Sequence, residues 1–168
     1  LKNIEYALEI NPKSVDAFLE KIRILHWGMG KSDVVASMEI PKEFENNLNV
    51  LQIMTYAFHA VKNFDEALEY AQKALKIEKS GMNYVWQGWI FHAMERDEEA
   101  KQCYDDAIKV EPKNAQGYEY MGHILAKEEN YQDAIGYFKK AWEISKHDDL
   151  ILEQGVAMKE IGKRLRDA

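Results

Sequence analysis

Small and aromatic residues recur along this chain every 33 or 34 residues. In each unit an alanine is followed four residues later by an alanine or aromatic residue, and three residues after that by another alanine; the sets are Ala67, Ala71 and Ala74, then Ala100, Tyr104 and Ala107, then Ala134, Phe138 and Ala141. Gly88 and Gly122 also lie 34 residues apart. A fixed period of this length is typical of architectures in which one supersecondary unit stacks on the next.

The spacing inside each unit predicts helices. Residues at i, i+4 and i+7 share one face of an α-helix. Asn63 and Asn130 precede "FDEA" and "YQDA" and predict a short turn that leads into a second helix. Each unit is therefore expected to be a helix pair, which buries its apolar face only by stacking on its neighbours.

The order of these residues resembles the tetratricopeptide repeat. One unit carries the pattern on Tyr118, Met121, Gly122, Leu125, Ala134, Phe138 and Ala141, and the unit before it on Tyr84, Gly88, Phe91, Ala100, Tyr104, Ala107 and Pro112. The resemblance covers nearly the whole chain. It implies an all-α fold, a right-handed superhelical α-solenoid of helix-turn-helix repeats.

The repeat frame divides residues 1–168 into one array. We expect the second helix of a truncated repeat at 1–12, a degenerate repeat at 15–47, repeats at 48–80, 81–114 and 115–147, and a partial repeat or capping helix at 148–168. The last segment keeps Gly155 and Gly162. Two interpretations of the ends stay open: the array is cut from a longer one, or the C-terminal helix is its cap.

The repeat at 15–47 departs from the pattern. Val34 and Pro41 occupy the positions of the two small alanines. A proline inside a helix removes a hydrogen bond and costs about 3 kcal/mol or more. We therefore expect the second helix to end near Ile40, with a non-helical bridge over 41–46.

The resemblance also implies where a partner would bind, because the first helix of each repeat lines the inner, concave face in this family. The candidate groove residues are Arg23, His26, Gln52, Tyr56, His59, Val85, Trp89, His92, Glu119 and His123. Tyr56, Val85 and Trp89 are the expected apolar anchors, although Trp89 could instead only pack on the neighbouring unit. Some family members clamp a chaperone's C-terminal carboxylate. Of the matching positions here only Arg23 could bind one, so no such clamp is expected.

Three histidines occupy the same slot of successive units, since His26, His59 and His92 are each 33 residues apart. Three interpretations compete: a tolerant surface slot, a polar row that contacts a ligand, and a metal site. Packed helices lie about 8–10 Å apart, which is far for three imidazoles to reach one Zn²⁺. We therefore expect no metal site.

Composition restricts the remaining function classes. A net charge of −7 disfavours nucleic-acid binding. No apolar run is long enough for a membrane span, and the single cysteine, Cys103, suits a reducing, cytoplasmic setting. The acidic runs "DEEAK" and "YDDA" are interpreted as solvated outer surface.

No enzyme signature is present, because the chain has no glycine-rich phosphate loop, no nucleophile with a signature and no paired carboxylates in a plausible cleft. We therefore expect a protein–protein interaction scaffold without enzymatic activity or cofactor, which holds a peptide or partner segment on its concave face. The alternative is a structural piece of a larger assembly, or a homo-oligomer whose groove is filled by its own chain.

Overall fold

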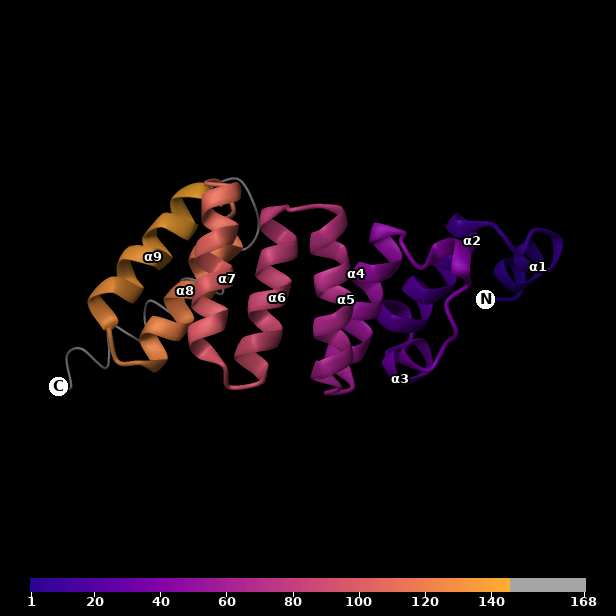
Figure 1. Cartoon of the computed structure of the whole chain (residues 1–168), viewed down its shortest axis with the longest axis horizontal. Helices are drawn as coiled ribbons and strands as arrows, with labels where there is room; N and C mark the ends of the chain where they lie inside the picture. Colours follow the sequence, from indigo (N-terminus) through magenta and orange to yellow (C-terminus); the bar gives the residue numbers. More distant parts are fainter. Residues whose placement is uncertain (146–168) are drawn as a thin grey trace. The chain divides into compact units, whose positions relative to one another are not determined.

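The computed structural model describes residues 1–145, and the described part contains helices and no strand. The α-helices are α1 (Lys2–Ile10), α2 (Val15–Arg23), α3 (Ser32–Ala36), α4 (Leu48–Ala60), α5 (Phe64–Ile77), α6 (Gly81–Ala93), α7 (Asp97–Val110), α8 (Ala115–Lys127) and α9 (Tyr131–Ile144) (Figure 1). The all-α fold expected from the sequence is thus confirmed. The segment 148–168, with Gly155 and Gly162, lies outside the described residues.

Four helices begin at a side-chain cap of the same kind. The residue before α2, α4, α6 and α8 accepts a hydrogen bond from the backbone N–H three positions later, at 2.8–3.3 Å; these caps are Ser14, Asn47, Ser80 and Asn114. Such a bond satisfies one of the free amides of a helix start. The caps therefore fix the starts of the first helices at Val15, Leu48, Gly81 and Ala115.

The helices pair as hairpins, α4 with α5, α6 with α7 and α8 with α9. Each pair turns through one residue with a positive φ, at Lys62 (61°), Glu95 (60°) and Glu129 (63°). The residue after it donates its backbone N–H to a carbonyl five positions earlier at 2.9 Å, as Arg96 does to Phe91. This left-handed C-terminal turn satisfies helix carbonyls that would otherwise lack a donor.

Glycine lets the paired helices come close at two equivalent points. A Cβ atom on Gly88 would lie 2.5 Å from Cε1 of Tyr104, and one on Gly122 would lie 2.9 Å from Cε1 of Phe138. Both rings are fully buried. The repeated glycine and aromatic residue are therefore two halves of one helix contact, because the ring fills the space that the missing side chain leaves.

The contacts divide the chain into two compact units, Leu1–Glu78 and Lys79–Ala168. The core of unit 1 joins α2, α3 and α4 through Phe18, Ile22, Val35 and Met54. In unit 2 the small residues of the repeat pattern on α7 and α9 are buried. They are Ala100, Ala107, Ala134 and Ala141.

The region around Pro41 differs in detail from the expectation. Helix α3 ends at Ala36 rather than near Ile40, and Lys42–Phe44 forms a 3₁₀ turn, η2, inside the stretch expected to be non-helical. The Ser37 hydroxyl donates to the Val34 carbonyl at 2.9 Å and competes with helix continuation. Phe44 is buried with its ring centroid 5.2 Å from that of Phe18, so the bridge contributes to the core.

A π-helical turn, η1 (Ile24–Gly28), follows α2 directly. No sequence signal predicted it. The turn shifts the residues after Arg23 relative to a continuous α-helix, because its hydrogen bonds span five residues. It therefore decides where His26 and Trp27 lie.

Candidate functional site

The first-helix face is defined here as the surface of α2, η1 and α4 in unit 1 and, separately, of α6 and α8 in unit 2. In unit 1 this face carries three aromatic rings in mutual contact. The ring centroid of Trp27 lies 4.9 Å from that of His26 and 6.0 Å from that of Tyr56, and His26 lies 6.4 Å from Tyr56. Trp27 is 56% exposed. These three residues form the aromatic cluster of unit 1.

The predicted residues around this cluster differ in accessibility. Arg23 is exposed at the end of α2, one turn before Trp27. Gln52 is half-buried one turn before Tyr56 on α4. The cluster therefore offers exposed apolar surface next to a cation, which suits a segment with apolar side chains.

His26 and His59 contact the second helix of their own hairpin. The Nδ1 atom of His26 lies 3.0 Å from the Ser32 hydroxyl, and the His59 ring lies 5.4 Å from the Phe64 ring. Both imidazoles are half-buried, and this burial lowers the pKa of each below its usual value because the charged form loses solvation. They hold positive charge less readily than exposed histidines do.

His92 makes the corresponding contact in unit 2. Of the three histidine contacts, this one is made with a charged group. Its Nδ1 atom lies 2.6 Å from Oδ1 of Asp97, the first residue of α7. Lys127 at the end of α8 donates to the other oxygen of Asp97 at 2.6 Å. Asp97 therefore joins three helices of unit 2, although it lies in the acidic run interpreted as solvated surface.

The interpretation of "DEEAK" as solvated outer surface also fails for Lys101. Its Nζ atom lies 2.6 Å from Glu98 on α7 and 2.8 Å from Glu128, which follows α8. Lys101 is largely covered, so this pair also ties α7 to the next hairpin. In "YDDA" the interpretation fits better, since Asp105 and Asp106 pair only within α7, with Lys109.

Val85 does not offer a groove surface, contrary to the expectation. It is 2% exposed on α6 and belongs to the core. Trp89, one turn later, is half-buried. A valine in a position expected to face a ligand is thus buried, which the repeat frame alone does not reveal.

Glu119 on α8 is 8% exposed, which is unusual for a carboxylate. Its Oε1 atom lies 3.9 Å from Nε2 of His123, one turn later. The exposed His123 ring packs edge-on against Phe138 at a centroid distance of 5.0 Å. The Tyr120 ring also contacts the His123 ring, and it stacks on the buried Tyr104 ring at a centroid distance of 5.5 Å.

The regular spacing of the histidines now has a structural reason. Each of His26, His59 and His92 meets a residue five or six positions later, at the start of the second helix of the same hairpin. Among residues 1–145, no three histidine, cysteine, aspartate or glutamate side chains are placed to hold a metal ion. The row is therefore a set of hairpin contacts. Burial opposes positive charge on two of its members, His26 and His59.

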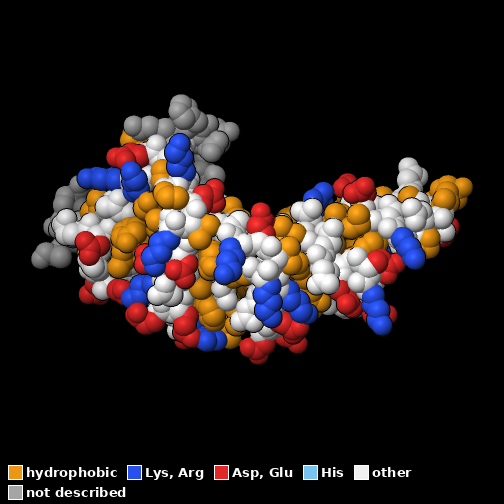
Figure 2. Space-filling model, turned by 45° about the horizontal axis from the view of Figure 1, so that its top comes forward, with side chains coloured by type: hydrophobic (Ala, Val, Ile, Leu, Met, Phe, Trp, Pro, Cys, Tyr) orange, Lys and Arg blue, Asp and Glu red, His pale blue; other side chains and the backbone are white. Residues whose placement is uncertain are grey.

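The Cys103 thiol is buried on α7, and burial raises its pKa to about 12. It is therefore a packed thiol rather than a nucleophile. Within the part of the chain that is described, no helix is long and apolar enough to cross a membrane. The face seen in Figure 2 mixes Lys and Arg with Asp and Glu and shows no single basic patch.

Comparison with known proteins identifies the repeat. A family model for the tetratricopeptide repeat matches residues 83–114, which cover most of α6, all of α7 and the turn after it. Residues 83–114 thus match a tetratricopeptide repeat, and the chain is similar to tetratricopeptide-repeat proteins. A curated relative, the TPR repeat-containing protein MJ1428 of Methanocaldococcus jannaschii, is 25% identical over 97 residues, or 58% of this chain. The chain spans 17% of the length of that relative.

Solved tetratricopeptide-repeat structures share the fold. MamA 41-end from Desulfovibrio magneticus RS-1 matches with a TM-score of 0.75 at 12% identity, covering 88% of this chain and 85% of that one. The thermophilic TPR protein TTC0263 of Thermus thermophilus matches with a TM-score of 0.72 at 15% identity, covering 94% and 86%. At these identities the likeness shows the fold alone.

The predicted groove residues did not include Trp27, which contacts two of them, His26 and Tyr56. Trp27 follows the last groove slot of its helix, and the π turn brings it against Tyr56. The glycines of "GMG" after Trp27 indicate that a regular helix ends there, but they do not predict the π turn.

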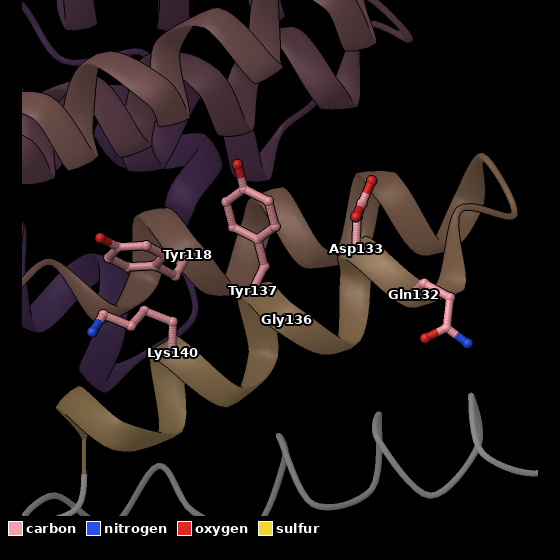
Figure 3. Close-up of a pocket in the computed structure, with 6 residues that line it drawn as sticks. All are labelled: Tyr118, Gln132, Asp133, Gly136, Tyr137 and Lys140. Carbon is pink, nitrogen blue, oxygen red and sulfur yellow. The ribbon is translucent and has the colours of Figure 1, made fainter.

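A pocket of about 320 Å³ lies elsewhere in unit 2 (Figure 3). Tyr118 comes from α8, and the other lining residues come from α9: Gln132, Asp133, Gly136, Tyr137 and Lys140. No predicted groove residue lines it. Unit 2 thus has a hollow between α8 and α9 that is lined by none of the predicted groove residues.

Proposed function

We propose that this chain is a protein-interaction scaffold that holds a partner segment on its first-helix face. Tetratricopeptide-repeat proteins are in general scaffolds of this kind, typically without enzymatic activity. The repeats at 15–47, 48–80, 81–114 and 115–147, and a cytoplasmic setting, belong to this proposal. No particular partner is implied by the relatives.

The aromatic cluster of unit 1 carries the proposal. Trp27 keeps more than half of its surface open while its ring is held by His26 and Tyr56. A large ring that is exposed and yet fixed in place loses little conformational entropy when it binds, which is why tryptophan and tyrosine dominate binding hot spots. Arg23 at the edge supplies a cation for a polar group of the bound segment.

The proposal is tested by selecting peptides from a random library on the purified chain and measuring their affinity by calorimetry. Trp27→Ala should weaken the selected peptides by tenfold or more, because a hot-spot truncation costs about 2 kcal/mol or more. Trp142→Ala on α9 is the matched control, since it removes a partly exposed tryptophan from a second helix. Equal affinities for the two variants would contradict the proposal.

A second candidate, a structural piece of a larger assembly or a homo-oligomer, is favoured by α1. None of its residues is buried, and Leu1, Tyr6 and Ile10 are 40%, 64% and 69% exposed. Exposed apolar side chains of this size mark contact surfaces when they gather on one helix. Sedimentation equilibrium of the chain and of Tyr6→Ser/Ile10→Ser distinguishes the candidates, since a self-associating chain dissociates in the double variant.

A further inference from the structure

We infer that the first-helix face of unit 2 selects a partner segment carrying a lysine or arginine side chain, whose cation pairs with Glu119. This inference rests on the proposed function and adds to it the chemistry of one bound side chain. It starts from a carboxylate that the fold covers without supplying it a cation.

The environment of Glu119 is unusual for a charged group. The residue is 8% exposed, so most of its side chain is covered. Covering a charge is costly unless hydrogen bonds or an opposite charge compensate. Among the described residues, the nearest polar group recorded is Nε2 of His123, and 3.9 Å is too long for a hydrogen bond.

The lysines of unit 2 with recorded ion pairs are bound to other carboxylates. Lys101 pairs with Glu98 and Glu128, and Lys127 pairs with Asp97. Lys109 and Lys140 form their pairs within their own helices. Glu119 therefore stands apart from the ion-pair network of its unit, although it is better covered than any carboxylate in that network.

The surroundings of Glu119 suit the stem of a long basic side chain. His123, held edge-on by Phe138, and Tyr120 provide ring surface on the same helix. Helix α6, which contacts α8, contributes the half-buried Trp89 to the same first-helix face. Lysine and arginine cover apolar surface with their methylene groups while the charged end pairs with an acid. An acidic or purely apolar side chain would leave Glu119 uncompensated.

The test combines a protein variant with a peptide variant. Peptides selected from a random library on the wild-type chain are expected to be enriched in lysine or arginine. Replacing that lysine with norleucine, or that arginine with citrulline, removes the charge and keeps the stem. The wild-type chain should lose about tenfold to a hundredfold in affinity, as expected for a hydrogen bond to a charged group.

Glu119→Gln should abolish this discrimination, binding both members of each peptide pair within about twofold. Glutamine keeps the size of the side chain, and the thermal midpoint should not fall, because a covered charge is removed. Glu129→Gln, in the exposed turn after α8, changes the net charge equally and should leave the discrimination intact.

Two results would overturn the inference while leaving the proposed function standing. Either the selected peptides bind equally well with and without the cation, or Glu119→Gln discriminates as strongly as the wild-type chain. A chain on which no peptide can be selected contradicts the proposed function and this inference together.

Discussion

Nδ1 of His92 lies 2.6 Å from Oδ1 of Asp97, across the turn that joins α6 to α7. The second oxygen of the same carboxylate accepts from Lys127 of α8. One acidic side chain thus connects a hairpin to its successor. A polar contact of this kind complements the apolar contacts between glycine and aromatic rings inside each hairpin.

Removing the Asp97 charge should therefore destabilise unit 2. Asp97→Asn weakens both contacts, and we expect a loss of about 1–2 kcal/mol in the free energy of unfolding, measured with urea at pH 7. Asp105→Asn, a more exposed position on the same helix, should cost about 0.5 kcal/mol or less. Equal losses would show that Asp97 has no special role.

The stability difference between wild type and Asp97→Asn should depend on pH. Burial opposes ionisation of Asp97, but hydrogen bonds from Lys127 and His92 outweigh it and lower the pKa. A lowered pKa contributes stability above the usual carboxyl value of about 3.9, and this stability is lost as pH falls through the folded-state pKa. The gap between wild type and Asp97→Asn should thus narrow below about pH 4.

Gly122 and Gly136 should respond oppositely to the same substitution. Gly122→Ala places a Cβ atom 2.9 Å from the Phe138 ring, and Gly122→Leu overpacks the contact further, so we expect a loss of about 1–3 kcal/mol. A Cβ atom on Gly136 meets nothing within 4 Å. Gly136→Ala should add about 0.5–1 kcal/mol through helix propensity. Thermal midpoints of the two alanine variants moving in the same direction would refute this assignment.

The buried Tyr104 hydroxyl should lower the free energy of unfolding. The side chain is fully buried, and in the part of the chain described here the hydroxyl has no hydrogen-bond partner. Tyr104→Phe should be neutral or stabilising by up to about 1 kcal/mol, since it removes an unsatisfied group. The reciprocal change, Phe138→Tyr, should destabilise. A large loss of stability in Tyr104→Phe would mean that the hydroxyl is satisfied in solution.

Acid should weaken unit 1 through its two covered histidines. Burial lowers the pKa of His26 and His59, so their folded-state pKa lies below the unfolded value of about 6.5. Stability is then complete above pH 6.5 and decreases as pH falls through that value towards the folded pKa. Urea unfolding at pH 7.5 and 5.5 should show this loss in wild type and a smaller one in His59→Gln. An identical loss in both would place the effect elsewhere.

The sequence allowed the fold to be predicted because its strongest signals are local and repeated. Gly88 with Tyr104, and Gly122 with Phe138, lie at one constant spacing and describe a single helix contact. Ser80 and its equivalents are local signals of the same kind, since each one caps the helix that begins at the next residue.

The site was predicted less completely, because it depends on side chains that meet across turns. The spacing of the histidines was visible, but its cause was not, since the partner of His92 lay in an acidic run that resembles ordinary solvated surface. Trp27 was missed because a π turn has no pattern of its own in the sequence. Val85 was misplaced because a slot in a repeat does not specify how far neighbouring helices cover it.

The central claim is that the first-helix face binds the partner segment, and the four tryptophans report on it directly. Their indole N–H signals can be followed by two-dimensional NMR while a library-selected peptide is titrated. We predict that the signal of Trp27 or of Trp89, each on the first-helix face of its own unit, shifts and that the signal of Trp142 on α9 does not. A shift of Trp142 with Trp27 and Trp89 unchanged would place the partner on the second helices and contradict the account.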